Sequence, residues 1–168
     1  MKIEDNLLDQ HIFDQLQTLI IGEMGIAWFY VPVIEIGDYE KNQFIHWFYN
    51  DGASCSPHLD YLTSVFEIIT PATLYRIRAN LMTQTPTIVK NIFHTDIIEF
   101  ANVPEKLKQW TTSIFYVNSN NGYTEFEDGT KVESVANRLV TFPANLKHRG
   151  TSCTDENIRV VINFDYFK

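Results

Sequence analysis

The stretch "YVNSNNGYTEFEDGTKVESVANRLVTFPANLKHRGT", residues 116–151, decides the fold class. It consists of short runs of β-branched and aromatic residues, separated by Asn121-Gly122, Asp128-Gly129 and Pro143. Asn-Gly and Asp-Gly are strong signals for tight turns between antiparallel strands. The stretch therefore predicts short strands joined by tight turns.

Similar runs continue on both sides of this stretch. They are "TLYRIRANLMTQT" (73–85), "TIVKNIFHTDIIEF" (87–100), "WTTSIFYVNSN" (110–120) and "NIRVVINFDYF" (157–167). Seven or eight strands after a helical N-terminal third favour a mainly β barrel or two-sheet jelly roll, with helices packed on one sheet. A chain of 168 residues suits one domain. We expect a single domain over 1–168, with helical support over 1–72 and a β core over 73–168.

The N-terminal third predicts two helices with apolar segments between them. Apolar residues recur at helical spacing over 5–21, where Gly22 can end the helix, and again from the N-cap Ser56 to Pro71. Residues 25–37 predict a strand, and residues 42–52 form a second apolar segment that ends in a turn.

Composition limits the classes of partner. The net charge is −8, and no run of basic residues occurs, so binding to nucleic acid is not expected. Two cysteines are too few for a disulfide framework, and neither a signal peptide nor a long apolar run is evident. We expect a soluble cytoplasmic protein with no membrane partner.

The sequence holds two His-x-Asp triplets, and their predicted settings separate them. His58 and Asp60 fall on the second predicted helix, where residues i and i+2 point about 200° apart. His94 and Asp96 fall on a predicted strand, where i and i+2 share a face, so the two can chelate one metal ion. His46, between Ile45 and Trp47, is expected to be structural, as is the helix-borne His11.

A third ligand is needed, and His148 is the only histidine later in the chain. Two histidines and one carboxylate, with further positions open, suit a non-haem iron(II) that activates O₂. Zinc with a bound water is the competing ion for the same three residues.

Arg159 stands in the otherwise apolar last strand, eleven residues after His148. A guanidinium inside a barrel is costly unless an anion pairs with it, and a dicarboxylate cosubstrate would be such an anion. An Arg at the sheet edge that faces water, or pairs with an acidic residue, is the alternative reading.

These residues resemble the pattern of the iron(II)- and 2-oxoglutarate-dependent dioxygenases, in particular their prolyl-hydroxylase-like branch. The resemblance covers about residues 75–167 and follows six landmarks in one order. They are His94-Thr95-Asp96, Tyr116-Val117-Asn118, Asn121-Gly122-Tyr123-Thr124-Glu125-Phe126, Asn137-Arg138-Leu139-Val140-Thr141-Phe142, His148-Arg149-Gly150 and Arg159. It implies the double-stranded β-helix, a cupin-like jelly roll.

The resemblance implies roles residue by residue. His94, Asp96 and His148 would bind iron(II), and Arg159 would grip the distal carboxylate of 2-oxoglutarate. Tyr116 matches a position whose hydroxyl often shares that carboxylate, although a tyrosine of the core is the alternative.

Asn80 resembles a cosubstrate-contacting Asn in related branches, at a different spacing, so a structural role is equally open. Two positions depart from the pattern: Asn121 replaces the first Gly of the hairpin, and Val161 stands where a Ser or Thr is usual. The run 116–151 also looks like a small group of oxygenase-like proteins of bacteriophages and marine bacteria, which adds a phage-infected bacterial cytoplasm to the expectations.

The implied activity is hydroxylation that consumes 2-oxoglutarate and O₂. A peptidyl residue, with proline favoured, or an amino-acid-like small molecule is the implied substrate, and it would approach near the loops around 51–56, 84–91 and 100–109. A non-catalytic jelly-roll domain that binds a metal or ligand, for instance in a virus, is the alternative. A nucleic-acid demethylase fits poorly with the acidic composition.

Overall fold

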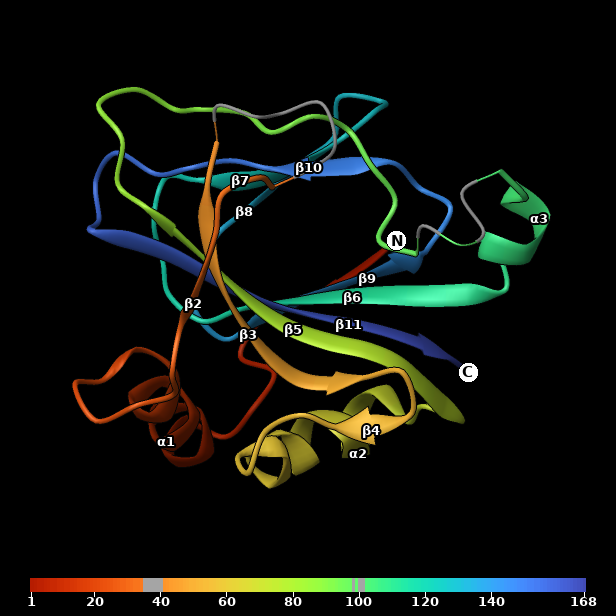
Figure 1. Cartoon of the computed structure of the whole chain (residues 1–168), viewed down its shortest axis with the longest axis horizontal. Helices are drawn as coiled ribbons and strands as arrows, with labels where there is room; N and C mark the ends of the chain where they lie inside the picture. The colour runs from red at the N-terminus through yellow and green to blue at the C-terminus, as the bar shows by residue number, and fades with distance from the viewer. Residues whose placement is uncertain (35–40, 98, 100–101) are drawn as a thin grey trace.

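The computed structural model describes residues 1–34, 41–97, 99 and 102–168. In this part of the chain an eight-stranded sheet lies opposite a three-stranded sheet, and all strand pairs are antiparallel (Figure 1). The strands are β1 (Lys2–Glu4), β2 (Phe29–Val31), β3 (Gln43–Asn50), β4 (Ala53–Ser54), β5 (Thr73–Thr83), β6 (Trp110–Tyr116), β7 (Tyr123–Phe126), β8 (Lys131–Glu133), β9 (Arg138–Pro143), β10 (His148–Gly150) and β11 (Ile158–Phe167).

The large sheet has the order β1-β9-β6-β11-β5-β3-β2, with β4 paired to β3, and the small sheet has the order β10-β7-β8. The predicted jelly roll with helices on one sheet is confirmed. The longest strands, β5 and β11, lie side by side in the middle of the large sheet, where they pair from Thr83 and Ile158 to Thr73 and Phe167. Their inner face forms the central part of the large sheet's surface toward the small sheet.

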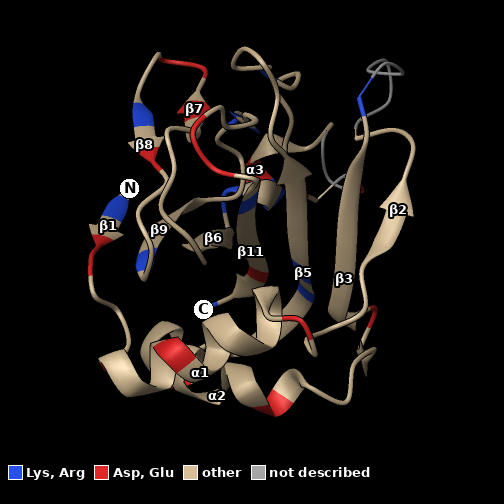
Figure 2. Ribbon diagram, turned by 90° about the vertical axis from the view of Figure 1, so that its left-hand side faces the viewer, with Lys and Arg blue, Asp and Glu red and all other residues tan. Residues whose placement is uncertain are grey.

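Two helices cover the other face of the large sheet (Figures 1 and 2). They are α1 (Gln10–Ile21) and α2 (Thr63–Ile69), the latter preceded by a 3₁₀ turn, η1 (Leu59–Leu62). A short helix, α3 (Pro104–Leu107), precedes β6. The first helix ends at Gly22 as predicted, but it begins at Gln10, because the backbone N–H groups of Leu7 and Leu8 donate to Asn137 instead.

Alternation along β6 explains the two main apolar clusters. Phe115 packs with the helices, in a cluster that includes Phe13 of α1 and Val65 of α2. Its neighbours Ile114 and Tyr116 point the opposite way, between the sheets, and pack with Phe126 of β7 and other residues of a second cluster. Successive side chains of a strand alternate between faces, so one strand contributes to both layers.

The N-terminal third contributes more to the sheet than predicted. β3 lies in the segment predicted as helical support, and it pairs with β5 along most of its length. The predicted strand over 25–37 is observed as β2 alone, and residues 35–37 lie outside the described part. The sheet therefore does not begin at residue 73.

The predicted strand over 87–100 is wrong for its described residues. Only two isolated β-bridges occur there, Lys90 with Thr151 and His94 with His148; residues 98 and 100 are not described. The backbone N–H of Val89 donates to the Ser152 hydroxyl at 2.9 Å. Backbone bonds join the described part of the segment to residues 148–152 only at Val89, Asn91 and His94, so no regular strand forms there.

Charged residues are distributed without a basic stripe. Figure 2 shows lysines and arginines singly or in small groups on several strands, with acidic residues between them. Within the described residues, no helix combines the length and the apolar character needed to cross a membrane.

Candidate metal centre and cosubstrate cavity

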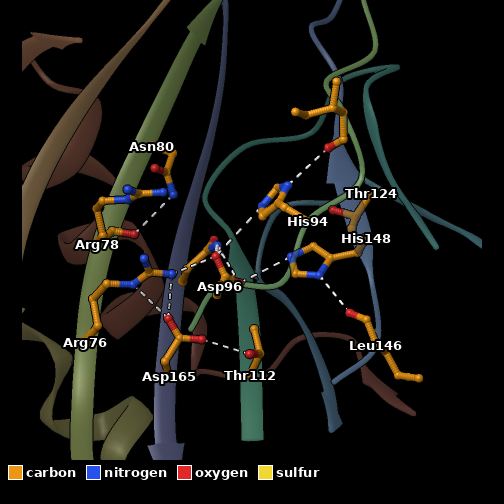
Figure 3. Close-up of polar contacts among 12 residues, drawn as sticks. Arg76, Arg78, Asn80, His94, Asp96, Thr112, Thr124, Leu146, His148 and Asp165 are labelled. Carbon is orange, nitrogen blue, oxygen red and sulfur yellow. Dashed lines mark hydrogen bonds and ion pairs between the residues drawn. The ribbon is translucent and has the colours of Figure 1, made fainter. Parts of the chain in front are cut away.

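His94, Asp96 and His148 meet between the two sheets. One potential ligand atom from each of the three lies within 4.8 Å of the others, and no further such cluster occurs among the described residues. The Nε2 atom of His148 lies 3.3 Å from Oδ2 of Asp96, and that of His94 lies 3.9 Å from Oδ1 (Figure 3). Chain segments 52 residues apart thus supply two imidazoles and one carboxylate to one small volume.

Backbone contacts orient both imidazoles. Nδ1 of His94 donates to the carbonyl oxygen of Ile92, and Nδ1 of His148 donates to that of Leu146, each at 3.2 Å. A donor at Nδ1 fixes the tautomer of a neutral imidazole and leaves Nε2 with a lone pair. Both Nε2 atoms therefore point to the side where Asp96 lies, and a metal ion there would take the place of a proton.

The charges at this centre are strongly coupled. Burial opposes the ionised form of Asp96, but Arg76 and His148 outweigh it and hold the pKa of Asp96 well below its usual range. Burial also opposes the charged form of His148, yet the Asp96 carboxylate outweighs it and raises the pKa of His148. The carboxylate stays ionised and favours a cation, a proton or a metal ion, beside it.

Side chains of the large sheet also contact the Asp96 carboxylate. Nη2 of Arg76 on β5 donates to Oδ1 of Asp96 at 2.7 Å, and Nε of Arg76 donates to Oδ2 of Asp165 on β11 at 2.9 Å (Figure 3). Thr112 on β6 donates to the other oxygen of Asp165 at 2.8 Å. Burial raises the pKa of Asp165 to about 6, although Arg76 lowers it.

Arg159 lies in the cavity that His94 and His148 also line. It is 3% exposed, its Nε donates to the Ser134 hydroxyl at 2.8 Å, and its Nη2 donates to the Thr124 hydroxyl at 3.3 Å. In the described part of the chain no carboxylate forms an ion pair with it, and burial lowers its pKa. The predicted edge-strand alternative is therefore wrong, because the side chain faces neither water nor an acidic residue.

Tyr116 lies next to Arg159 and Thr124. Its hydroxyl donates to the Thr124 hydroxyl at 2.8 Å, and the guanidinium carbon of Arg159 lies 5.8 Å from its ring centroid. Burial raises the pKa of Tyr116, so the phenol is neutral. Tyr116 is fully buried and belongs to the apolar cluster between the sheets, and Thr124 rather than Tyr116 lines the cavity.

Three buried carboxamides line the same cavity. Asn80 on β5 is one of them, together with Asn91 and Asn163, and each has a side-chain oxygen without a hydrogen-bond partner among the described residues. A buried acceptor without a partner costs free energy, so the cavity suits a ligand or water that donates to these oxygens.

Two glycines shape the surroundings of Arg159. A Cβ atom on Gly122 would lie 2.6 Å from Cδ of Arg159, and one on Gly150 would lie 3.4 Å from its Nη1. The Gly of the hairpin landmark is thus required by close approach, since a side chain there would displace the arginine.

The structure brings most of the predicted residues together. His94, His148, Arg159 and Asn80 line one cavity, Asp96 lies beside the two histidines, and Tyr116 reaches the cavity through Thr124. His58 and Asp60 lie at the start of η1, outside this centre. The sequence argument missed Arg76, Asp165, Ser134 and the role of Thr124; of these, Thr124 alone carried a signal, as part of the hairpin landmark.

Of the loops predicted to lie where a substrate approaches, one contributes to the cavity and another does not. Asn91, at the end of the 84–91 loop, lines the cavity, whereas no residue of 51–56 does. That loop contains β4 and lies beside α2 (Figure 1). Within 100–109, residues 100 and 101 lie outside the described part.

No protein-family model and no curated protein matches the sequence. Solved structures are similar in fold. A prolyl hydroxylase from Trichoplax adhaerens, in complex with a peptide fragment of the hypoxia inducible factor oxygen degradation domain, has 17% identity and a TM-score of 0.66, with 99% of this chain and 82% of that chain covered. A 2OG-Fe(II) oxygenase family oxidoreductase from Burkholderia pseudomallei has 11% identity and a TM-score of 0.65, with 97% and 82% covered.

A viral collagen prolyl hydroxylase from Paramecium Bursaria Chlorella virus-1 has 12% identity and a TM-score of 0.61, with 99% of this chain and 89% of that chain covered. Identities this low establish similarity of fold. The chain has the double-stranded β-helix fold that these oxygenase structures share.

Proposed function

We propose that this chain is an iron(II)- and 2-oxoglutarate-dependent oxygenase that hydroxylates a peptidyl residue, with proline favoured, or an amino-acid-like molecule. One observation carries the proposal. Arg159 is a buried cation without a carboxylate partner in the described part of the chain, and it lines the same cavity as His94 and His148. Because an uncompensated buried charge is costly, this cavity is suited to an anion next to a metal ion.

His94, Asp96 and His148 would hold the iron(II). The fit rests on the ligand types and on the contacts of the two Nδ1 atoms, which turn both Nε2 atoms toward Asp96. Two histidines and one carboxylate favour non-haem iron(II), although zinc accepts the same ligands. When bound, iron(II) and 2-oxoglutarate supply the activation of O₂ and the oxidation of a substrate C–H bond.

Arg159 and Thr124 would bind the distal carboxylate of 2-oxoglutarate. The Thr124 oxygen already accepts hydrogen bonds from Tyr116 and from Arg159, so both of its lone pairs are used. Its own hydroxyl hydrogen is left to donate, and a carboxylate is the acceptor that complements it and the guanidinium. Tyr116 would act through Thr124, and Asn80 would contact the cosubstrate from β5, the strand next to β11.

The cavity walls would exclude water from the reacting groups. Ile114, Val161 and Met82 supply apolar surface around the polar residues. The cavity has a volume of about 50 Å³, enough for a few water molecules. A five-carbon dicarboxylate would be accommodated by a turn of a flexible lining side chain such as Met82, a change of the scale that commonly accompanies binding.

The substrate class rests on analogy of fold. Similar structures include prolyl hydroxylases, one of them solved with a peptide fragment. A peptide substrate is proposed on this ground, and a cytoplasmic location and the phage-type branch also remain proposals. No observation favours the alternative, a non-catalytic binding domain.

Anaerobic titration of the full chain with iron(II) and 2-oxoglutarate tests the proposal. The chelate of the two gives a weak visible charge-transfer band, which we expect in the wild-type protein and in His58→Ala, the matched variant of the other His-x-Asp triplet. We expect no band in His148→Ala. The proposal fails if the wild-type protein gives no band or if His148→Ala keeps it, and a zinc site would give none.

A further inference from the structure

Arg76 joins the proposed metal ligand Asp96 to a second buried carboxylate. Its Nη2 lies 2.7 Å from Oδ1 of Asp96 and 2.8 Å from Oδ2 of Asp165. All three residues are buried, and Asp165 is 0% exposed. Figure 3 shows the guanidinium between the two carboxylates, with Thr112 on the far side of Asp165.

The backbone around Asp96 does not by itself fix the position of this carboxylate. The segment before it forms two isolated bridges, from Lys90 to Thr151 just after β10 and from His94 to His148 of β10. Arg76 and Asp165, by contrast, are paired with each other in the central strands β5 and β11. The ion pairs therefore attach an irregular segment to the most extensively paired part of the sheet.

A second side chain, Asn163, also holds the Asp96 carboxylate in place. Nδ2 of Asn163, also on β11, lies 3.4 Å from each oxygen of Asp96. Asn163 faces Arg78 across the strand pair, one step along the inner face from the pair of Arg76 and Asp165. The Asp96 carboxylate is thus contacted by two side chains of the large sheet, Arg76 on β5 and Asn163 on the neighbouring strand β11.

The charges of the arrangement matter as much as its geometry. A lone guanidinium beside Asp96 would compete with a metal ion for the carboxylate, because both are cations. Asp165 carries the balancing negative charge, so that Arg76 can hold Asp96 without adding a net charge to the centre. A pair whose role was only to join β5 and β11 would not need to reach Asp96.

We propose that Arg76 and Asp165 are positioning residues for the metal site: Arg76 holds Oδ1 of Asp96, and Asp165 holds and neutralises Arg76. Oδ2, which Arg76 does not contact and which lies 3.3 Å from His148 Nε2, would then bind the metal. This inference rests on the metal site proposed above. It adds that metal affinity depends on residues that touch neither the metal nor 2-oxoglutarate.

Cobalt(II) titration of the full chain, followed by its visible absorption, tests the inference. Partners that orient metal ligands typically affect affinity about 10–100-fold, and we expect a loss of this size in Arg76→Gln and in Arg76→Lys. Lysine keeps the charge but lacks the planar fork that contacts both carboxylates. The absorption spectrum of bound cobalt should also change shape. In these variants Arg76 no longer holds Oδ1 of Asp96, so the carboxylate can bind the cobalt ion in a different orientation.

Two further variants separate positioning from folding. Arg76→Gln leaves Asp165 buried without its partner, so the double variant Arg76→Gln/Asp165→Asn, which removes both charges, should fold and still bind cobalt at least about 10-fold more weakly. Arg138→Gln is the matched control, because it breaks an arginine–aspartate pair with Asp5 away from the cavity. It should keep wild-type affinity.

The outcomes distinguish this inference from the proposed function. If the wild-type protein binds cobalt and the folded double variant binds it equally tightly, Arg76 and Asp165 serve stability alone and the inference is overturned. If the wild-type protein binds no cobalt at all, both the metal site and the inference fail.

Discussion

His94 and His148 face each other across an isolated antiparallel β-bridge, in which each backbone N–H donates to the carbonyl oxygen of the other at 3.0 Å. Their ring centroids lie 5.0 Å apart. The backbone therefore brings the two proposed ligands together independently of their side chains, and loss of one imidazole should leave the other in place.

His94→Ala should abolish stabilisation by a bound metal ion. A ligand present at 100 times its dissociation constant stabilises the folded state by about 2.7 kcal/mol, which corresponds to roughly 5–11 °C in the melting temperature of a domain this size. We expect a shift of this size when manganese(II) is added to the wild-type protein, and none with His94→Ala. Thermal unfolding followed by circular dichroism measures it, and an equal shift in the variant would exclude His94 as a ligand.

Arg159→Met should weaken 2-oxoglutarate binding and yet stabilise the unliganded protein. The substitution removes a buried cation that has no carboxylate partner in the described part of the chain, so the free energy of unfolding should rise by about 1 kcal/mol or more. Calorimetric titration with 2-oxoglutarate in the presence of manganese(II) should show at least a tenfold loss of affinity.

Lys131 offers a control for the charge of Arg159. It lies near the ring of Tyr123, at 4.7 Å from the centroid, and does not line the cavity. Lys131→Met should retain wild-type affinity for 2-oxoglutarate. Equal losses in both variants would mean that general charge, rather than a specific contact, governs binding.

Gly122→Ala should disturb Arg159 through steric contact alone. The added methyl group would lie 2.6 Å from Cδ of Arg159 and 2.7 Å from the Ser152 carbonyl oxygen. Overpacking of this kind costs about 1–3 kcal/mol, which urea denaturation measures, and 2-oxoglutarate affinity should fall as well. Gly52→Ala, at a φ of +80° with nothing within 4 Å, should reduce stability but keep the affinity.

His46 should make stability depend on pH below about 6.5. Its ring bonds the Ala27 carbonyl oxygen at 2.8 Å and the Ser56 hydroxyl at 2.9 Å, and burial lowers its pKa despite the bond to Ala27. The unfolded chain then binds the proton more readily, so this contribution is complete above the unfolded pKa of 6.5 and is lost as the pH falls.

Urea denaturation at pH 7.5 and pH 5 compares the wild-type protein with His46→Gln. The variant should lose less stability on acidification than the wild-type protein does. If both lose the same amount, His46 is not the group that titrates.

The strands of the jelly roll were predictable because local patterns determine them. Alternation and tight-turn pairs gave β6, β7, β8, β9 and β11, and Asp128-Gly129 is indeed a turn between paired strands, with Gly129 at a φ of +88°. Asn121-Gly122 instead leads from β6 in the large sheet to β7 in the small one. A turn signal does not say which sheet the next strand joins, since that depends on distant partners.

The meeting of His94, Asp96 and His148 was predictable, but for a different reason from the one assumed. His94 and Asp96 converge with His148 although their segment is not a regular strand, because single backbone bridges and Arg76 hold it. Arg76 and Asp165 carried no signal, since each is one polar residue in a β-strand far from the triplet in sequence. Only the pairing of β5 with β11 brings them together.

A crystal structure of the full chain with manganese(II) and 2-oxoglutarate, grown without oxygen, tests the central claim most directly. We expect the metal bound by His94, Asp96 and His148, and the distal carboxylate of 2-oxoglutarate at Arg159 and Thr124. Manganese bound elsewhere, or a 2-oxoglutarate molecule that does not contact Arg159 at saturating concentration, would contradict it.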